Sequence, residues 1–179
     1  MPPRPWFVFE ITPDCNADCI YCYNVWKAPG AGRPVPLDTR AAAGLIRKLR
    51  AEAEPAGITF TGGEPLLRDD LVELVSAAST AGIPRICIAT NGVLLTPELA
   101  GRLTGAGARH FEVSLPSSDR AIYESLCGLD ALTAAREAIR HAVSAGTEVS
   151  VAVMLGGPTL SCVADVVSTA FAYGARAVV

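Results

Sequence analysis

Three cysteines near the start of the chain are the residues best suited to chemistry. Cys15, Cys19 and Cys22 are separated by three residues and then by two, so all three lie within eight residues. Loop spacings of this length let a chain wrap around one compact metal centre, and thiolates are soft ligands that suit iron–sulfur clusters or zinc. The segment therefore predicts a metal site.

The number of ligands favours one metal over the other. A structural zinc site requires a fourth Cys or His at a short spacing, but His110 and His141 are remote from the three cysteines in the sequence. A 4Fe–4S cluster that only transfers electrons is ordinarily held by four cysteines. Three cysteines leave one iron open to an outside ligand, so we expect chemistry at an iron–sulfur cluster and keep zinc as the weaker alternative.

Further polar residues follow predicted strands. The segment Thr61-Gly62-Gly63-Glu64-Pro65 comes directly after the second predicted strand. Glycine lets a backbone approach a ligand closely, and a carboxylate accepts hydrogen bonds from an ammonium group. Asn91 and Ser114 stand near the ends of the third and fourth predicted strands. Residues of these types are also ordinary turn formers, so the nearby cysteines are what make a binding role the favoured interpretation.

The elements that must position these residues alternate between strands and helices. Apolar runs predict strands at 6–12, 58–61, 85–90, 109–115, 148–155 and 175–179. Amphipathic spacing and capping residues predict helices near 38–53, 70–81, 96–105, 130–145 and 162–173, with a loop between 115 and 130. Strands joined by single helices form a parallel sheet with right-handed crossovers. Six such strands are too few for an eightfold barrel, so we predict an α/β partial (β/α)6 barrel with residues 1–179 as one domain.

Composition excludes several classes of protein. The 179 residues are 50% hydrophobic and carry a net charge of -3, which fits one globular core and excludes disorder. The charge is nearly balanced, so we expect no nucleic-acid partner. We expect no membrane contact either, because no run approaches the roughly 20 apolar residues of a spanning helix. Without a secretory signal pattern the expected location is cytoplasmic, where six cysteines favour metal or redox chemistry over disulfides.

Taken together, these motifs resemble the radical S-adenosylmethionine (radical SAM) superfamily. The resemblance rests on the spacing of the three cysteines, on Tyr21 before the last of them, and on the Gly-Gly-Glu segment. It implies a barrel-like α/β core whose cysteines bind a 4Fe–4S cluster that an external flavodoxin- or ferredoxin-type donor reduces. In such enzymes the reduced cluster cleaves SAM to a 5'-deoxyadenosyl radical, which takes hydrogen from the substrate. The residues implied to hold SAM are Tyr21, Gly63, Glu64, Asn91 and Ser114.

The resemblance leaves the substrate unknown. The molybdenum-cofactor branch of the family uses arginines to bind a nucleoside triphosphate at the positions of Val8 and Thr59, so GTP is not expected here. Residues 22–27 look most like the SPASM-type peptide maturases, which favours a peptide. Those relatives carry a Cys-rich C-terminal extension, and this chain ends in an apolar run, so a C-terminally truncated core domain is expected. The alternative function is a non-catalytic or degenerate iron–sulfur or zinc binding module.

Overall fold

The computed structural model describes residues 4–28 and 30–179, and its centre is one parallel sheet of six strands. The strands lie side by side in chain order, with every neighbouring pair parallel, as successive right-handed βαβ units require. They are β1 (Trp6–Thr12), β2 (Gly57–Gly62), β3 (Ile86–Thr90), β4 (His110–Ser114), β5 (Glu148–Ala152) and β6 (Ala177–Val178). All six predicted strands are confirmed.

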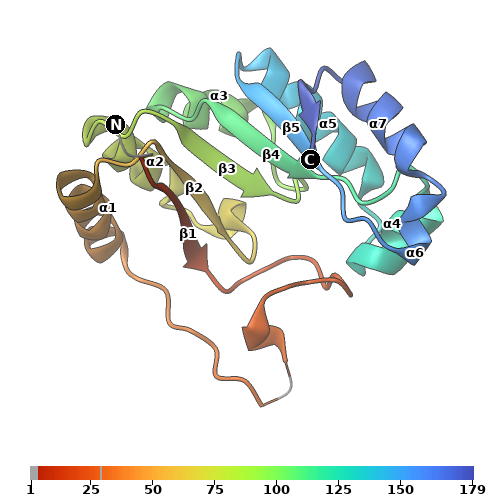
Figure 1. The fold of residues 1–179 in the computed structure, drawn as a ribbon, viewed down its shortest axis with the longest axis horizontal. Helices are drawn as coiled ribbons and strands as arrows, with labels where there is room; N and C mark the ends of the chain where they lie inside the picture. The colour runs from red at the N-terminus through yellow and green to blue at the C-terminus, as the bar shows by residue number, and fades with distance from the viewer. Residues whose placement is uncertain (1–3, 29) are drawn as a thin grey trace.

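Helices pack along one side of the sheet (Figure 1). The five predicted helices are confirmed as α1 (Thr39–Ala53), α2 (Leu71–Thr80), α3 (Pro97–Ala106), α5 (Leu132–Ser144) and α7 (Val163–Ala172). The structure adds α4 (Arg120–Cys127), the single turn α6 (Gly157–Leu160), and the 3-10 turns η1 (Val25–Lys27) and η2 (Pro65–Leu67). Within the described parts of the chain, no helix is long and apolar enough to cross a bilayer.

The prediction of a loop between residues 115 and 130 was wrong, because this segment contains α4. The helix begins where the carboxylate of Asp119 accepts a hydrogen bond of 2.9 Å from the Ile122 amide. It ends at Gly128, whose φ of 71° is left-handed. Its eight residues are too few for a periodic pattern to stand out in the sequence.

The two faces of the sheet differ in polarity. On β4, Phe111 and Val113 are fully buried, whereas Glu112 and Ser114 are only partly buried and point to the other face. The apolar face packs under the helices and forms the core. The sheet is open, with β1 and β6 as its edges among the described strands, so the structure is a partial barrel whose inner face is polar.

Candidate functional site

The cysteine loop leaves β1 and immediately pairs with the end of β2. The amide of Gly63 donates to the Thr12 carbonyl, and the amide of Glu64 donates to the Asp14 carbonyl, both at 2.7 Å. A side chain at Gly63 would overlap the Asp14 carbonyl. Gly62 has a φ of 135°, and a side chain there would overlap the Thr12 carbonyl. Both glycines are therefore needed for the close approach of the loop's own backbone.

The other side of the loop is held by the last turn of α4. The amide of Asp18 donates to the Cys127 carbonyl at 3.0 Å, and that of Ile20 to the Leu126 carbonyl at 2.9 Å. Carbonyls in the last turn of a helix have no partner within the helix, so the loop satisfies them. The cysteine loop is consequently fixed between β2 and α4.

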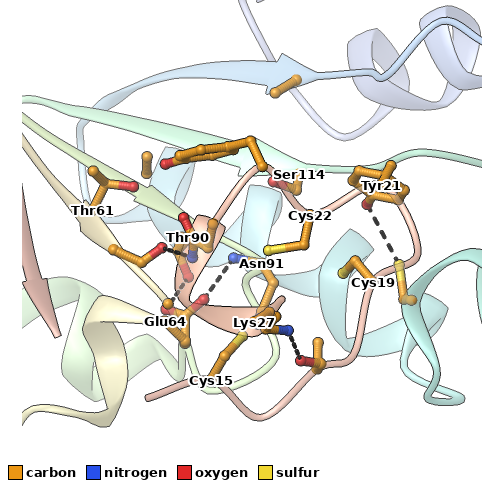
Figure 2. A pocket seen from close by; sticks show the side chains of 18 of the residues that line it. Cys15, Cys19, Tyr21, Cys22, Lys27, Thr61, Glu64, Thr90, Asn91 and Ser114 are labelled. Carbon is orange, nitrogen blue, oxygen red and sulfur yellow. Dashed lines mark hydrogen bonds between the residues drawn. The ribbon is translucent and has the colours of Figure 1, made fainter. Parts of the chain in front are cut away.

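The loop and the strand ends enclose a cavity of about 290 Å3 (Figure 2). A cavity of this size lies near the lower end of the range for small-molecule sites. All eight residues predicted from the sequence line it, namely Cys15, Cys19, Cys22, Tyr21, Gly63, Glu64, Asn91 and Ser114. Their roles as ligands of a cluster or of SAM stay predictions, but the fold brings them to one place.

Sequence reasoning missed other lining residues, including Asn24, Lys27, Glu112 and Tyr123. The period of two along a strand places Glu112 on the same face as Ser114, so that signal was available. Tyr123 lies on the missed helix α4. Lys27 is held by a hydrogen bond of 3.0 Å to the Ala17 carbonyl and lies 3.5 Å from the Asp18 carboxylate. Its charge therefore lies beside the cysteine loop.

The three thiols have the chemistry of a cluster site, although their side chains do not converge. Within residues 4–28 and 30–179, no three His, Cys, Asp or Glu side chains are grouped as a metal site. A hydrogen bond with Cys127 and burial raise the pKa of Cys19, and burial raises that of Cys15. Three thiols on one loop facing one cavity fit an iron–sulfur cluster with an open iron, provided that they turn toward a common centre.

Glu64 is buried and joins two strand ends. Its side chain is 1% exposed and accepts three hydrogen bonds. Oε1 accepts from the Leu66 amide at 3.0 Å and from the Thr90 hydroxyl at 2.6 Å, and Oε2 accepts from the Asn91 amide at 2.8 Å. Burial raises the pKa of Glu64, and the three donors oppose that rise. The carboxylate thus ties the end of β2 to the end of β3 at the cavity wall.

Asn91 joins β3 to the cysteine loop. Its Nδ2 donates to Oδ1 of Asn16 at 2.7 Å, and its Oδ1 accepts from the Val93 amide at 3.0 Å. Both polar atoms of the side chain are therefore already paired within the protein. Figure 2 shows Asn91 between Glu64 and Cys22, with Ser114 on the neighbouring strand.

A comparison with protein-family models assigns the chain to a family. Residues 9–170 match the model of the radical SAM superfamily. This range includes the cysteine loop and the ends of β1 to β5. The chain belongs to the radical SAM superfamily. Members of this family are enzymes that use a 4Fe–4S cluster and SAM.

Curated relatives match most of this chain. A protein of Sulfurisphaera tokodaii named "Probable GTP 3',8-cyclase" is 33% identical over 136 residues, which cover 76% of this chain and 42% of the relative. An "AdoMet-dependent heme synthase" of Methanosarcina barkeri is 32% identical over 122 residues, covering 68% of this chain and 34% of the relative. The chain thus spans less than half the length of these curated relatives.

A solved structure of another protein has the same fold. SuiB of Streptococcus suis, crystallised with its precursor peptide SuiA, aligns with a TM-score of 0.82 at 14% sequence identity. The alignment covers 98% of this chain and 38% of SuiB. At this identity the similarity establishes the architecture, and it confirms the predicted barrel-like α/β core.

Proposed function

We propose that residues 1–179 form the core domain of a radical SAM enzyme that binds a 4Fe–4S cluster through Cys15, Cys19 and Cys22. One observation carries the proposal, which is that the cysteine motif and the Gly-Gly-Glu motif line one cavity although they are far apart in the sequence. When bound, the reduced cluster supplies the electron that cleaves SAM to a radical able to take hydrogen from a substrate. Gly63, Glu64, Tyr21, Asn91 and Ser114 surround the space proposed for SAM.

The protein's own residues have supporting roles in this proposal. Lys27 places a positive charge beside the loop, which lowers the pKa of Cys15 and Cys19 against the effect of burial and favours the thiolates that bind iron. Glu64 and Asn91 hold the ends of β2 and β3 against the loop. These contacts pre-organise the cavity before any ligand binds.

Electron paramagnetic resonance of the anaerobically reconstituted, dithionite-reduced protein tests this proposal. We expect a reduced 4Fe–4S signal that changes when SAM is added. Cys19→Ala should lose the signal, whereas Cys162→Ala should keep it, because Cys162 is buried away from the cavity. A cluster signal that SAM does not alter would contradict the proposed enzyme function and would favour the alternative, a non-catalytic iron–sulfur binding module. If metal analysis finds zinc and no iron bound to the protein, the zinc binding module is favoured.

A peptide is the substrate class that we propose, based on the resemblance of residues 22–27 to peptide maturases. The named relatives make GTP the second candidate. Val8 and Thr59 are register partners on β1 and β2, so two uncharged side chains stand together where a triphosphate would need cations. Among the described residues that line the cavity, the cationic side chain is that of Lys27, which is already bound to Ala17 and near Asp18.

The substrate proposal is tested by following 5'-deoxyadenosine release. GTP should neither accelerate this release nor be consumed, and GTP consumption would replace the peptide proposal with a cyclase-like one. An external flavodoxin or ferredoxin should support the same release in place of dithionite. Since iron-binding thiols require a reducing compartment, we also propose a cytoplasmic location, which cell fractionation would check.

A further inference from the structure

Asn24 has a buried polar atom with no hydrogen-bond partner among residues 4–28 and 30–179. Its side chain lines the cavity and is 5% exposed. Nδ2 donates a hydrogen bond of 3.0 Å to the Gly62 carbonyl. Because a carbonyl oxygen can only accept, this bond identifies the amide atom that faces Gly62 as the nitrogen. The opposite atom, Oδ1, is buried and has no hydrogen-bond donor among the described residues.

Buried polar atoms in folded proteins almost always have a partner, so Oδ1 requires an N–H or O–H donor from elsewhere. Two other buried side-chain atoms in the described residues lack partners, Nε1 of Trp26 and Nε of Arg136. Neither residue lines this cavity. Of these three residues with an unpaired buried atom, Asn24 is therefore the one that lines the proposed SAM site.

The neighbours of Asn24 indicate which donor it takes. The Gly62 carbonyl that holds Asn24 directly precedes Gly63 and Glu64, which the proposed function places around SAM. The amino group of SAM is a cationic donor, and the Glu64 carboxylate is an acceptor of the type that suits it. Glu64 already accepts three hydrogen bonds from the protein, so its oxygens have little capacity left for an amino group. The Asn24 amide, which the adjoining Gly62 carbonyl holds in the cavity lining, supplies a further acceptor oxygen.

We propose that Oδ1 of Asn24 accepts a hydrogen bond from the amino group of SAM. This inference rests on the proposed function, because it needs SAM in the cavity. It makes Asn24 a binding residue and limits its role to the methionine part of the cofactor. The adenosine part gains nothing from this contact.

Two ligands distinguish binding of the methionine part of SAM from binding of its adenosine part. S-adenosylhomocysteine carries the amino and carboxylate groups of SAM, whereas 5'-methylthioadenosine lacks both. Their affinities for the anaerobically reconstituted protein are measured by calorimetry without substrate, so a substrate amino group cannot account for the result. Asn24→Leu should weaken S-adenosylhomocysteine binding roughly tenfold, the typical effect of one hydrogen bond to a charged group. Binding of 5'-methylthioadenosine should not change.

Asn24→Asp provides a second variant that keeps an oxygen acceptor. It should retain the preference for S-adenosylhomocysteine, because a carboxylate oxygen still accepts a hydrogen bond from the ligand's amino group. A lost preference would overturn the proposal. If Asn24→Leu does not fold, this variant decides alone.

Trp26→Phe is the matched control, since it removes the other unpaired atom on the same short segment but lies outside the cavity. It should bind both ligands as the wild type does. If Asn24→Leu keeps the wild-type preference for S-adenosylhomocysteine, the inference fails while the proposed function stands. If the wild-type protein binds neither SAM nor S-adenosylhomocysteine, the proposed function itself fails.

Discussion

Glu64 shows how one residue joins the stability of the fold to the site. Its carboxylate is almost fully buried and accepts from Thr90, Asn91 and Leu66, so three donors depend on it. The resemblance assigns the same carboxylate to SAM. A loss of SAM binding in a Glu64 variant is therefore interpretable only together with the variant's stability.

Glu64→Ala should lower the free energy of unfolding by about 3 kcal/mol or more, because it leaves three buried donors without an acceptor. Urea denaturation of the cluster-free protein measures this. Glu124→Ala, which removes an exposed carboxylate on α4, should leave stability within about 0.5 kcal/mol of the wild type. Equal stability of the two variants would contradict the role of Glu64 at the strand ends.

Gly63 sets how closely the cysteine loop approaches β2. Gly63→Ala places a Cβ against the Asp14 carbonyl and should break the hydrogen bonds of the Gly63 and Glu64 amides. We expect lower stability and a lower iron content after reconstitution. In Gly101→Ala the new Cβ meets open space on α3, so stability should rise by about 0.5–1 kcal/mol. Normal iron loading in Gly63→Ala would show that the close approach is dispensable.

At the scale of elements, α4 supports the cysteine loop through its last-turn carbonyls. Asp119→Ala removes the N-cap of α4 and should cost about 1 kcal/mol of helix stability. The amides of Asp18 and Ile20, which bond to this helix, should then exchange faster in hydrogen–deuterium exchange. Thr96→Ala removes the N-cap of α3 and should leave these two amides unaffected. Equal exchange in both variants would mean that α4 does not hold the loop.

A bidentate ion pair between Arg68 and Asp70 joins three elements. Arg68 Nε and Nη2 donate to Asp70 at 2.7 and 2.6 Å, and Nη1 donates to the carbonyl of Ile11 at the end of β1. Asp70 also accepts from Thr39 at the start of α1. The Asp70 side chain is 20% exposed, so the pair is poorly screened by solvent.

The ion pair predicts a pH dependence of stability. The hydrogen bond from Arg68 holds the pKa of Asp70 below its usual range. Its stabilisation is therefore fully present above the ordinary pKa of about 4 and is lost as the pH falls through the lower folded-state pKa. Asp70→Asn should cost about 1–3 kcal/mol at pH 7 by urea denaturation.

Below about pH 4 the difference between Asp70→Asn and the wild type should shrink. The exposed pair of Arg120 and Asp130 offers a control, and Asp130→Asn should have no measurable effect at either pH. A constant difference across this range would show that Asp70 acts through something other than its charge.

At the scale of the whole molecule, we propose that residues 1–179 fold as one unit around the apolar face of the sheet. Phe111 on β4 is fully buried at the centre of this core. Phe111→Ala should lower the free energy of unfolding by about 3–5 kcal/mol. The transitions followed by tryptophan fluorescence and by circular dichroism should still coincide.

Phe171→Ala is the control for this core, because its ring on α7 is 53% exposed. Its cost should be below about 1 kcal/mol. Two separate transitions in the wild-type protein would indicate more than one folding unit.

The order of strands and helices followed from the sequence, because it depends on local features. A period of two, a period of 3.6, and capping residues such as Asp38 and Thr96 are all read within a few residues. The cysteine spacing, the Gly-Gly-Glu segment and the polar residues at the strand ends are local as well. They were enough to predict the family and eight of the residues that line the cavity.

Only the tertiary structure decided how these residues are used. The sequence suggested that Gly62 and Gly63 approach a ligand, but Gly62 meets the backbone of Thr12 at the end of β1, and Gly63 meets the backbone of the cysteine loop at Asp14. It also could not show that Glu64 is buried under three donors or that Asn24 has an unpaired oxygen. Each of these facts depends on a contact between segments that are distant in the chain, and no local pattern encodes such a contact.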